Sequence, residues 1–123
     1  MAQLVANELR GYGINTNCAP VLDVPVAGAH DIIGDRAYGA TPTQSIELAR
    51  EVGDGLMAGG VVPVIKHIPG HGRATADSHL DLPVVATGYD ALSQSDFVPF
   101  RALANMPAAM TAHVVFSAID ASN

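Results

Sequence analysis

The chain has 123 residues, 49% of them hydrophobic and only 5% aromatic, with a formal net charge of −6 at pH 7. This length and composition fit one small globular domain with an aliphatic core and exclude a disordered chain. The acidic balance without a Lys/Arg cluster argues against a nucleic-acid surface, and no apolar run is long enough to span a bilayer. The single cysteine, Cys18, permits a reducing compartment, and the N-terminus lacks a signal-peptide profile.

The first third of the chain predicts a helix, a strand and a long loop. Apolar residues at helical spacing, followed by two glycines, predict an amphipathic helix over residues 2–12. The apolar positions at helical spacing are Val5, Leu9 and Tyr12. Residues 14–19, closed by Pro20, predict a strand, and residues 23–41 lack any sustained period. Long loops of this kind in compact domains are often functional.

A second helix is predicted from Thr41 to about Ala58. Thr41 is a good N-cap, Pro42 fits the first helical position, and the Gly59-Gly60 pair predicts a left-handed stop. The predicted buried stripe consists of Ile46, Ala49, Val52 and Leu56. The β-branched run at residues 61–65 then predicts a buried strand.

Residues 66–79, K-H-I-P-G-H-G-R-A-T-A-D-S-H, follow this strand and concentrate three histidines, two cations and a carboxylate. In parallel α/β architectures the carboxyl ends of strands feed the loops that hold ligands. Pro69 with its neighbouring glycines argues against a regular helix here. This segment is therefore the predicted functional site.

The last third predicts a helix capped by Ser95-Asp96 and a strand over residues 108–112 that ends at His113. The resulting alternation of helices and strands predicts an α/β fold with about three parallel strands and right-handed crossovers. Three strands do not close a barrel, and an open sheet this narrow leaves apolar faces uncovered, so we expect residues 1–123 to be part of a larger domain.

The three histidines of residues 66–79 do not form a convincing metal site. His67 and His71 are four residues apart, but Pro69 prevents the helix that would align them, and neither an H-E-x-x-H motif nor a cysteine partner accompanies them. We therefore predict no metal.

Asp77 and His79 are the candidate acid/base pair. A carboxylate two positions from an imidazole can fix its tautomer and raise the basicity of the other ring nitrogen. Alternatively, Asp77 merely caps a turn and His79 is exposed.

The candidate ligand-binding cations have equally simple alternatives. Lys66 and His67, directly after buried residues, contact a ligand or are solvated. Arg36 reaches a sugar hydroxyl or carboxylate from the long loop, or forms a weak surface pair with Asp35. We expect His113, at the end of the last strand, to face the same end of the sheet as Lys66, His67 and Arg36. We expect His30 to be solvated.

Four segments resemble the N-terminal barrel domain of family-three glycoside hydrolases, on the branch of bacterial β-N-acetylglucosaminidases: N-C-A-P-V-L-D-V, I-G-D-R-A-Y, K-H-I-P-G-H-G-R-A-T-A-D-S-H and M-T-A-H-V. The D-S-H ending separates this branch from the β-glucosidases of the family. Ile68 stands where the family usually has Phe.

The resemblance implies a partial (β/α)₈ barrel and a retaining mechanism without a cofactor. It implies that His79 is the general acid/base, oriented by Asp77, and that Arg36, Lys66 and His67 hold the N-acetylglucosamine ring. Retaining glycosidases generally use paired carboxyl groups, so a histidine acid is unusual. The implied substrate is a small carbohydrate from peptidoglycan, N-acetylglucosamine linked to anhydro-N-acetylmuramic acid, handled during cell-wall recycling in the cytoplasm.

We expect two aspartates of the family pattern to lie outside residues 1–123, namely the nucleophile and an upstream sugar-binding aspartate. The family nucleophile is an aspartate in an S-D-D-type motif, and nothing resembling it occurs in residues 1–123. A complete barrel takes about 250 residues. We therefore expect this chain alone to be inactive. The alternatives are a truncated barrel remnant without turnover and a family relative that acts on another β-glycoside.

Overall fold

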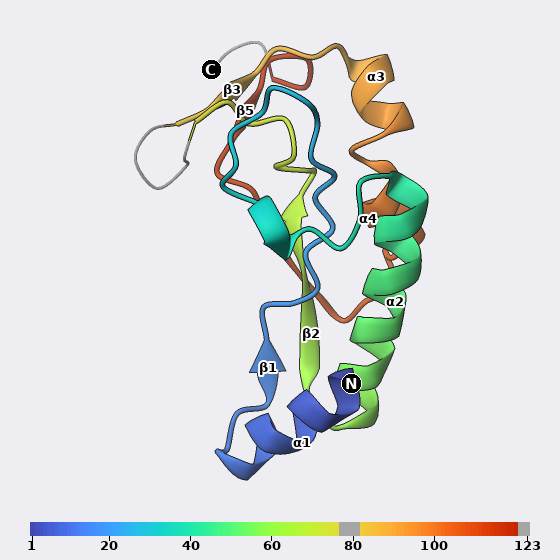
Figure 1. Ribbon diagram of the computed structural model, residues 1–123. Helices are drawn as coiled ribbons and strands as arrows, with labels where there is room; N and C mark the ends of the chain where they lie inside the picture. The colour runs from blue at the N-terminus through green and yellow to red at the C-terminus, as the bar shows by residue number, and fades with distance from the viewer. Residues whose placement is uncertain (77–81, 121–123) are drawn as a thin grey trace.

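The computed structural model describes residues 1–76 and 82–120. Figure 1 shows its elements, which in chain order are α1 (Ala2–Gly11), β1 (Thr16–Asn17), a 3-10 turn (Gly34–Arg36), α2 (Pro42–Ala58), β2 (Val62–Ile68), β3 (Val84–Val85), α3 (Tyr89–Gln94), α4 (Val98–Ala102), β4 (Ala108–Thr111) and β5 (Val115–Phe116).

The strands confirm the predicted parallel α/β arrangement. β2 lies between β1 and β4 in one sheet, and both pairings are parallel. β3 and β5 form a second, two-stranded parallel sheet that the sequence did not predict. Each of these two strands spans only two residues, which is too short for a periodic signal to be read.

Helices cover one face of the main sheet. The core on this face consists of Leu22, Ala49, Ile65, Phe100, Leu103 and Met106. Side chains alternate along β2, so that Pro63 and Ile65 are buried whereas Val62 is 40% exposed. Met110 of β4 is 39% exposed. The opposite face therefore carries apolar side chains that remain open to solvent.

The first helix is confirmed, but of its predicted apolar face only Leu9 packs against the core, and Leu9 is half-buried. Tyr12 is 86% exposed and Val5 is 41% exposed, whereas Ala6 is fully buried. A Cβ atom added to Gly59 would lie only 2.3 Å from the Cβ of Ala6. The residue in contact is therefore a small one, because α1 and the end of α2 approach too closely to admit larger side chains.

α2 confirms the predicted boundaries and cap. The Thr41 hydroxyl accepts a hydrogen bond from the Gln44 amide at 3.3 Å, and the left-handed stop falls on Gly60, with φ of 77°. The buried positions are Ser45, Ala49, Gly53 and Leu56. Ser45 and Gly53 replace the predicted Ile46 and Val52, which are only half-buried. A hydroxyl and a glycine give no hydrophobic signal, so periodicity missed this shift.

β2 extends further than predicted, through Lys66 and His67 to Ile68. These two polar residues belong to the strand and not to the loop after it. By contrast, the strand predicted over residues 14–19 is reduced to β1, although Val21 forms an isolated parallel bridge with Lys66.

The predicted cap of the last helix is also wrong. α4 begins after Phe97, without a side-chain cap, and α3 precedes it where no helix was predicted. Asp96 is instead buried, at 3% exposure, and pairs with Arg73. The sequence pattern of a cap was present, but a cation 23 residues away in sequence is the partner. Within the described part of the chain, no helix is long and apolar enough to cross a membrane.

Candidate active site

The site is organised around Asp23, whose side chain is fully buried. Its Oδ1 atom accepts hydrogen bonds from the backbone amides of His67 at 3.2 Å and His71 at 2.7 Å. Its Oδ2 atom lies 2.6 Å from Nδ1 of the His67 ring. One carboxylate thus joins the end of β2 to the loop that follows it.

The end of β2 departs from regular strand geometry. Lys66 pairs with Met110 and Ile68 with Thr111, so His67 is an extra residue relative to β4. A bulge of this kind breaks the alternation of side chains and re-aims one of them. The Lys66–His67 peptide bond is cis.

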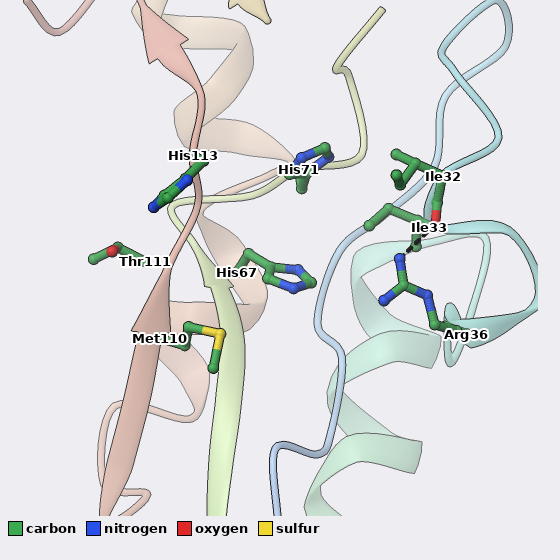
Figure 2. A pocket seen from close by; sticks show the side chains of 8 residues that line it. All are labelled: Ile32, Ile33, Arg36, His67, His71, Met110, Thr111 and His113. Carbon is green, nitrogen blue, oxygen red and sulfur yellow. Dashed lines mark hydrogen bonds between the residues drawn. The ribbon is translucent and has the colours of Figure 1, made fainter. Parts of the chain in front are cut away.

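A cavity of about 280 Å³ opens beside the bulge. Figure 2 shows its lining residues, which are Ile32, Ile33, Arg36, His67, His71, Met110, Thr111 and His113. Arg36 and His67 project into the same space from the 3-10 turn and from β2. The cavity therefore combines cationic and imidazole hydrogen-bonding groups with apolar walls, as small-molecule sites commonly do.

Arg36 also lines a second cavity, of about 540 Å³, together with Lys66, Asp35 and Tyr38. Burial raises the pKa of the Tyr38 phenol, which keeps it protonated. Arg36 donates a hydrogen bond to the carbonyl of Ile32 within its own loop. Arg36 therefore lines both the cavity that His67 lines and the cavity that Lys66 lines.

His71 is 4% exposed, and its ring lies edge-on to that of His67 with centroids 5.7 Å apart. Burial lowers the pKa of His71, an effect that its backbone hydrogen bond and Asp23 only partly oppose. The imidazole is therefore neutral at pH 7. It forms part of the cavity wall without adding charge to it.

The loop after β2 is fixed at a second point. Arg73 donates from Nε to Oδ2 of Asp96 at 2.7 Å and from Nη2 to the Ser95 hydroxyl at 3.0 Å. The Asp96 side chain is 3% exposed and that of Arg73 is 24% exposed. Arg73 thus ties the loop to the junction between α3 and α4, four residues before Asp77 in sequence.

Three of the five predicted site residues can be placed. Arg36 and His67 line one cavity, and Arg36 and Lys66 line the next. Asp77 and His79 lie outside the described residues, so the acid/base pair stays a prediction. His113 lines the first cavity, as expected for the end of the last strand of the main sheet, and His30 is exposed. No group of three or more metal-ligating side chains occurs in residues 1–76 and 82–120.

The sequence reasoning missed Asp23 and His71 as site residues. The available signal for Asp23 was a carboxylate that directly follows the apolar pair Val21-Leu22, since such a group must find a partner if the strand is buried. His71 was considered only as a metal ligand. Its place in the cavity depends on a loop conformation that periodicity does not reveal.

Comparison with known proteins identifies the family to which the chain is similar. The model of the glycosyl hydrolase family 3 N-terminal domain matches residues 1–123. A β-hexosaminidase of Alkalilimnicola ehrlichii is 44% identical over 122 residues, which are 98% of this chain and 35% of that protein. A β-hexosaminidase of Methylococcus capsulatus is 43% identical, over 96% of this chain and 36% of its own length.

Two solved structures are similar in three dimensions. A family 3 β-N-acetylglucosaminidase from Paenibacillus has a TM-score of 0.93 at 40% identity, over 99% of this chain and 24% of that one. NagZ from Neisseria gonorrhoeae, in complex with N-trifluoroacetyl-D-glucosamine, has a TM-score of 0.90 at 38% identity. The match covers 97% of this chain and 35% of that one.

The chain spans about a third of the length of the curated relatives it matches. Its three parallel strands with their helices correspond to part of a (β/α) barrel, as predicted. Because the family model covers every residue and relatives above 40% identity cover nearly the whole chain, the chain belongs to glycosyl hydrolase family 3, within the N-terminal domain.

Proposed function

We propose that the whole protein is a retaining β-N-acetylglucosaminidase that removes terminal N-acetylglucosamine from small carbohydrates. The observation that carries the proposal is the cavity lined by Arg36 and His67. The chain is 38% identical in sequence to a NagZ whose structure contains N-trifluoroacetyl-D-glucosamine. Arginine and imidazole nitrogens suit the hydroxyl and amide groups of such a sugar. Lys66 supplies a further cation at the neighbouring cavity.

His79 is proposed as the general acid/base, with Asp77 holding its tautomer. In the first step the imidazolium gives a proton to the glycosidic oxygen as a carboxylate attacks the anomeric carbon and the C–O bond breaks. In the second step neutral His79 takes a proton from water, which displaces the enzyme carboxylate from the sugar. The attacking aspartate implied by the family has no counterpart in residues 1–123, so the proposal concerns the whole protein.

His79→Ala in the whole protein tests the acid role. Turnover should fall by about 10²- to 10⁴-fold for alkyl and sugar leaving groups, which need a proton. It should fall far less for nitrophenyl glycosides, because their leaving oxygen is already acidic. Equal losses on both substrate types would contradict the acid role.

The proposed natural substrate is N-acetylglucosamine β-linked to anhydro-N-acetylmuramic acid, released during cell-wall recycling, and the proposed compartment is the cytoplasm. Competition between this disaccharide and simple β-glucosides measures the preference directly. A preference for a glucoside would favour the alternative of a relative with another sugar specificity. No hydrolysis of any β-glycoside would favour an inactive barrel.

A further inference from the structure

Asp23 has an arrangement that backbone packing alone does not require. A buried carboxylate is costly unless charged or polar groups satisfy it. Among the described residues, its donors are two backbone amides and the His67 ring, which come 44 and 48 residues later in the chain. Two amides on Oδ1 would suffice to close the turn, yet Oδ2 is committed to an imidazole nitrogen.

The contact with Oδ2 decides the tautomer of His67. An ionised carboxylate only accepts hydrogen bonds, so the proton must be on Nδ1 at the 2.6 Å contact. The neutral ring then leaves Nε2 as an acceptor. The His67 side chain is 17% exposed, and His67 lines the cavity, so its remaining hydrogen-bonding capacity is available there.

Arg36 supplies the complementary chemistry. Its guanidinium carries only donors, and Figure 2 shows it facing the cavity across from His67. A sugar hydroxyl is both a donor and an acceptor, so a ring seated between the two residues can accept from Arg36 and donate to His67. This pairing requires Nε2 of His67 to lack a proton.

We propose that Asp23 is a positioning residue that fixes the Nδ1-protonated tautomer of His67 and thereby presents Nε2 as the acceptor for a hydroxyl group of the bound sugar. The contact with sugar rests on the proposed function. The control of the tautomer does not, because it follows from the geometry of Asp23 and His67 alone.

Asp23→Asn is the discriminating variant. The amide oxygen can still accept from the backbone amides of His67 and His71, so the turn is retained. The amide nitrogen replaces Oδ2 and donates to Nδ1, which moves the ring proton to Nε2. The substitution thus inverts the tautomer with almost no change in shape.

The first measurement is the tautomer itself, from two-bond ¹H–¹⁵N correlation spectra of the whole protein labelled at histidine, with His67 assigned from a His67→Phe variant. We expect Nδ1–H in the unsubstituted protein and Nε2–H in Asp23→Asn. A ring protonated at Nε2 in the unsubstituted protein would overturn the proposal, and this result does not depend on whether the variant folds.

The second measurement is kcat and KM with an N-acetylglucosaminide. Asp23→Asn should lower kcat/KM by about tenfold or more, the loss typical when a buried hydrogen-bonding group is mismatched. In a His67→Phe background the same substitution should add less than about twofold, because Asp23 acts through His67. Independent losses would indicate a purely structural role and overturn the proposal.

Ser45→Ala is the matched control. Ser45 is fully buried and donates to the carbonyl of Leu22, directly before Asp23, at 3.2 Å. It should lower the melting temperature while leaving the tautomer, kcat and KM unchanged. A loss of activity equal to that of Asp23→Asn would assign the effect to general loosening of this segment. An unsubstituted protein that hydrolyses no N-acetylglucosaminide would refute the proposed function, and the tautomer spectra would still decide the role of Asp23.

Discussion

His71 shows how burial couples one residue to the pH dependence of stability. Its folded pKa is lowered from the ordinary 6.5, so the unfolded chain binds a proton more readily than the folded one. At pH values more than about one unit above 6.5, His71 is almost unprotonated in both states and the difference has no effect. As the pH falls below 6.5, the unfolded state gains the proton first, and the free energy of unfolding decreases.

We therefore expect the melting temperature to fall between about pH 7.5 and 5.5, before most carboxylates begin to titrate. In His71→Gln the same pH range should change the melting temperature less, because the titrating group is gone. Scanning calorimetry at several pH values measures both slopes. Parallel slopes in the two proteins would show that His71 does not carry this pH dependence.

The two cations of the site give a second prediction at this scale. Lys66→Ala or Arg36→Ala in the whole protein should lower kcat/KM for N-acetylglucosaminides by roughly ten- to a hundred-fold, the loss of a charge-assisted hydrogen bond. Both residues line the same 540 Å³ cavity, so the two effects should be non-additive. Steady-state kinetics of the single and double variants, with melting temperatures as the folding control, test this. Normal kcat/KM in both single variants would show that the sugar does not bind at the cavity lined by Arg36 and Lys66.

At the scale of elements, the loop after β2 is packed against the loop that follows Asp23. The amide of Val26 donates to the carbonyl of Gly72 at 3.2 Å, and a Cβ atom added to Gly72 would lie 2.0 Å from the carbonyl oxygen of Val24. That oxygen belongs to the backbone and cannot move aside as the end of a flexible side chain can. The close approach of these two loops brings His71 to Asp23.

Gly72→Ala should consequently cost about 3 kcal/mol of stability, the upper end of overpacking penalties. Gly88→Ala is the matched control, since Gly88 has φ of −62° and nothing within 4 Å of the added Cβ. Chemical denaturation of both variants gives the difference. If Gly72→Ala were as stable as Gly88→Ala, the two loops would not be in the contact described.

For the whole molecule, the uncovered face of the sheet predicts how the 123-residue polypeptide behaves alone. Val62 and Met110 are about two-fifths exposed there, and both β1 and β4 form only one strand pairing within the described sheet. Open strand edges and contiguous apolar surface favour association. We expect the isolated polypeptide to be poorly soluble or to self-associate, as measured by sedimentation velocity. A sharp, cooperative melt of a monomer would contradict this expectation.

The sequence by itself determined the features that depend on neighbouring residues. The Thr41 cap, the glycine stop of α2 and the β-branched run of β2 are local signals, because their hydrogen bonds and periods close within a few positions. The prediction that Arg36 and His67 lie near each other also needed only local signals, since strand ends and long loops meet at one end of parallel α/β sheets, and both residues line one cavity.

Tertiary structure alone decided the partners of buried polar groups. Asp23 accepts hydrogen bonds from His67 and His71, which come 44 and 48 positions later in the chain. Asp96 binds Arg73, although the local sequence around Asp96 resembles a helix cap. It also decided that Ala6 and Gly53, with no hydrophobic signal of note, are buried, Ala6 against Gly59 and Gly53 against Met106. A buried charge takes the partner that lowers its free energy most, and a close helix contact takes the residue that fits. Both depend on which distant segments meet, and no local pattern along the chain encodes that meeting.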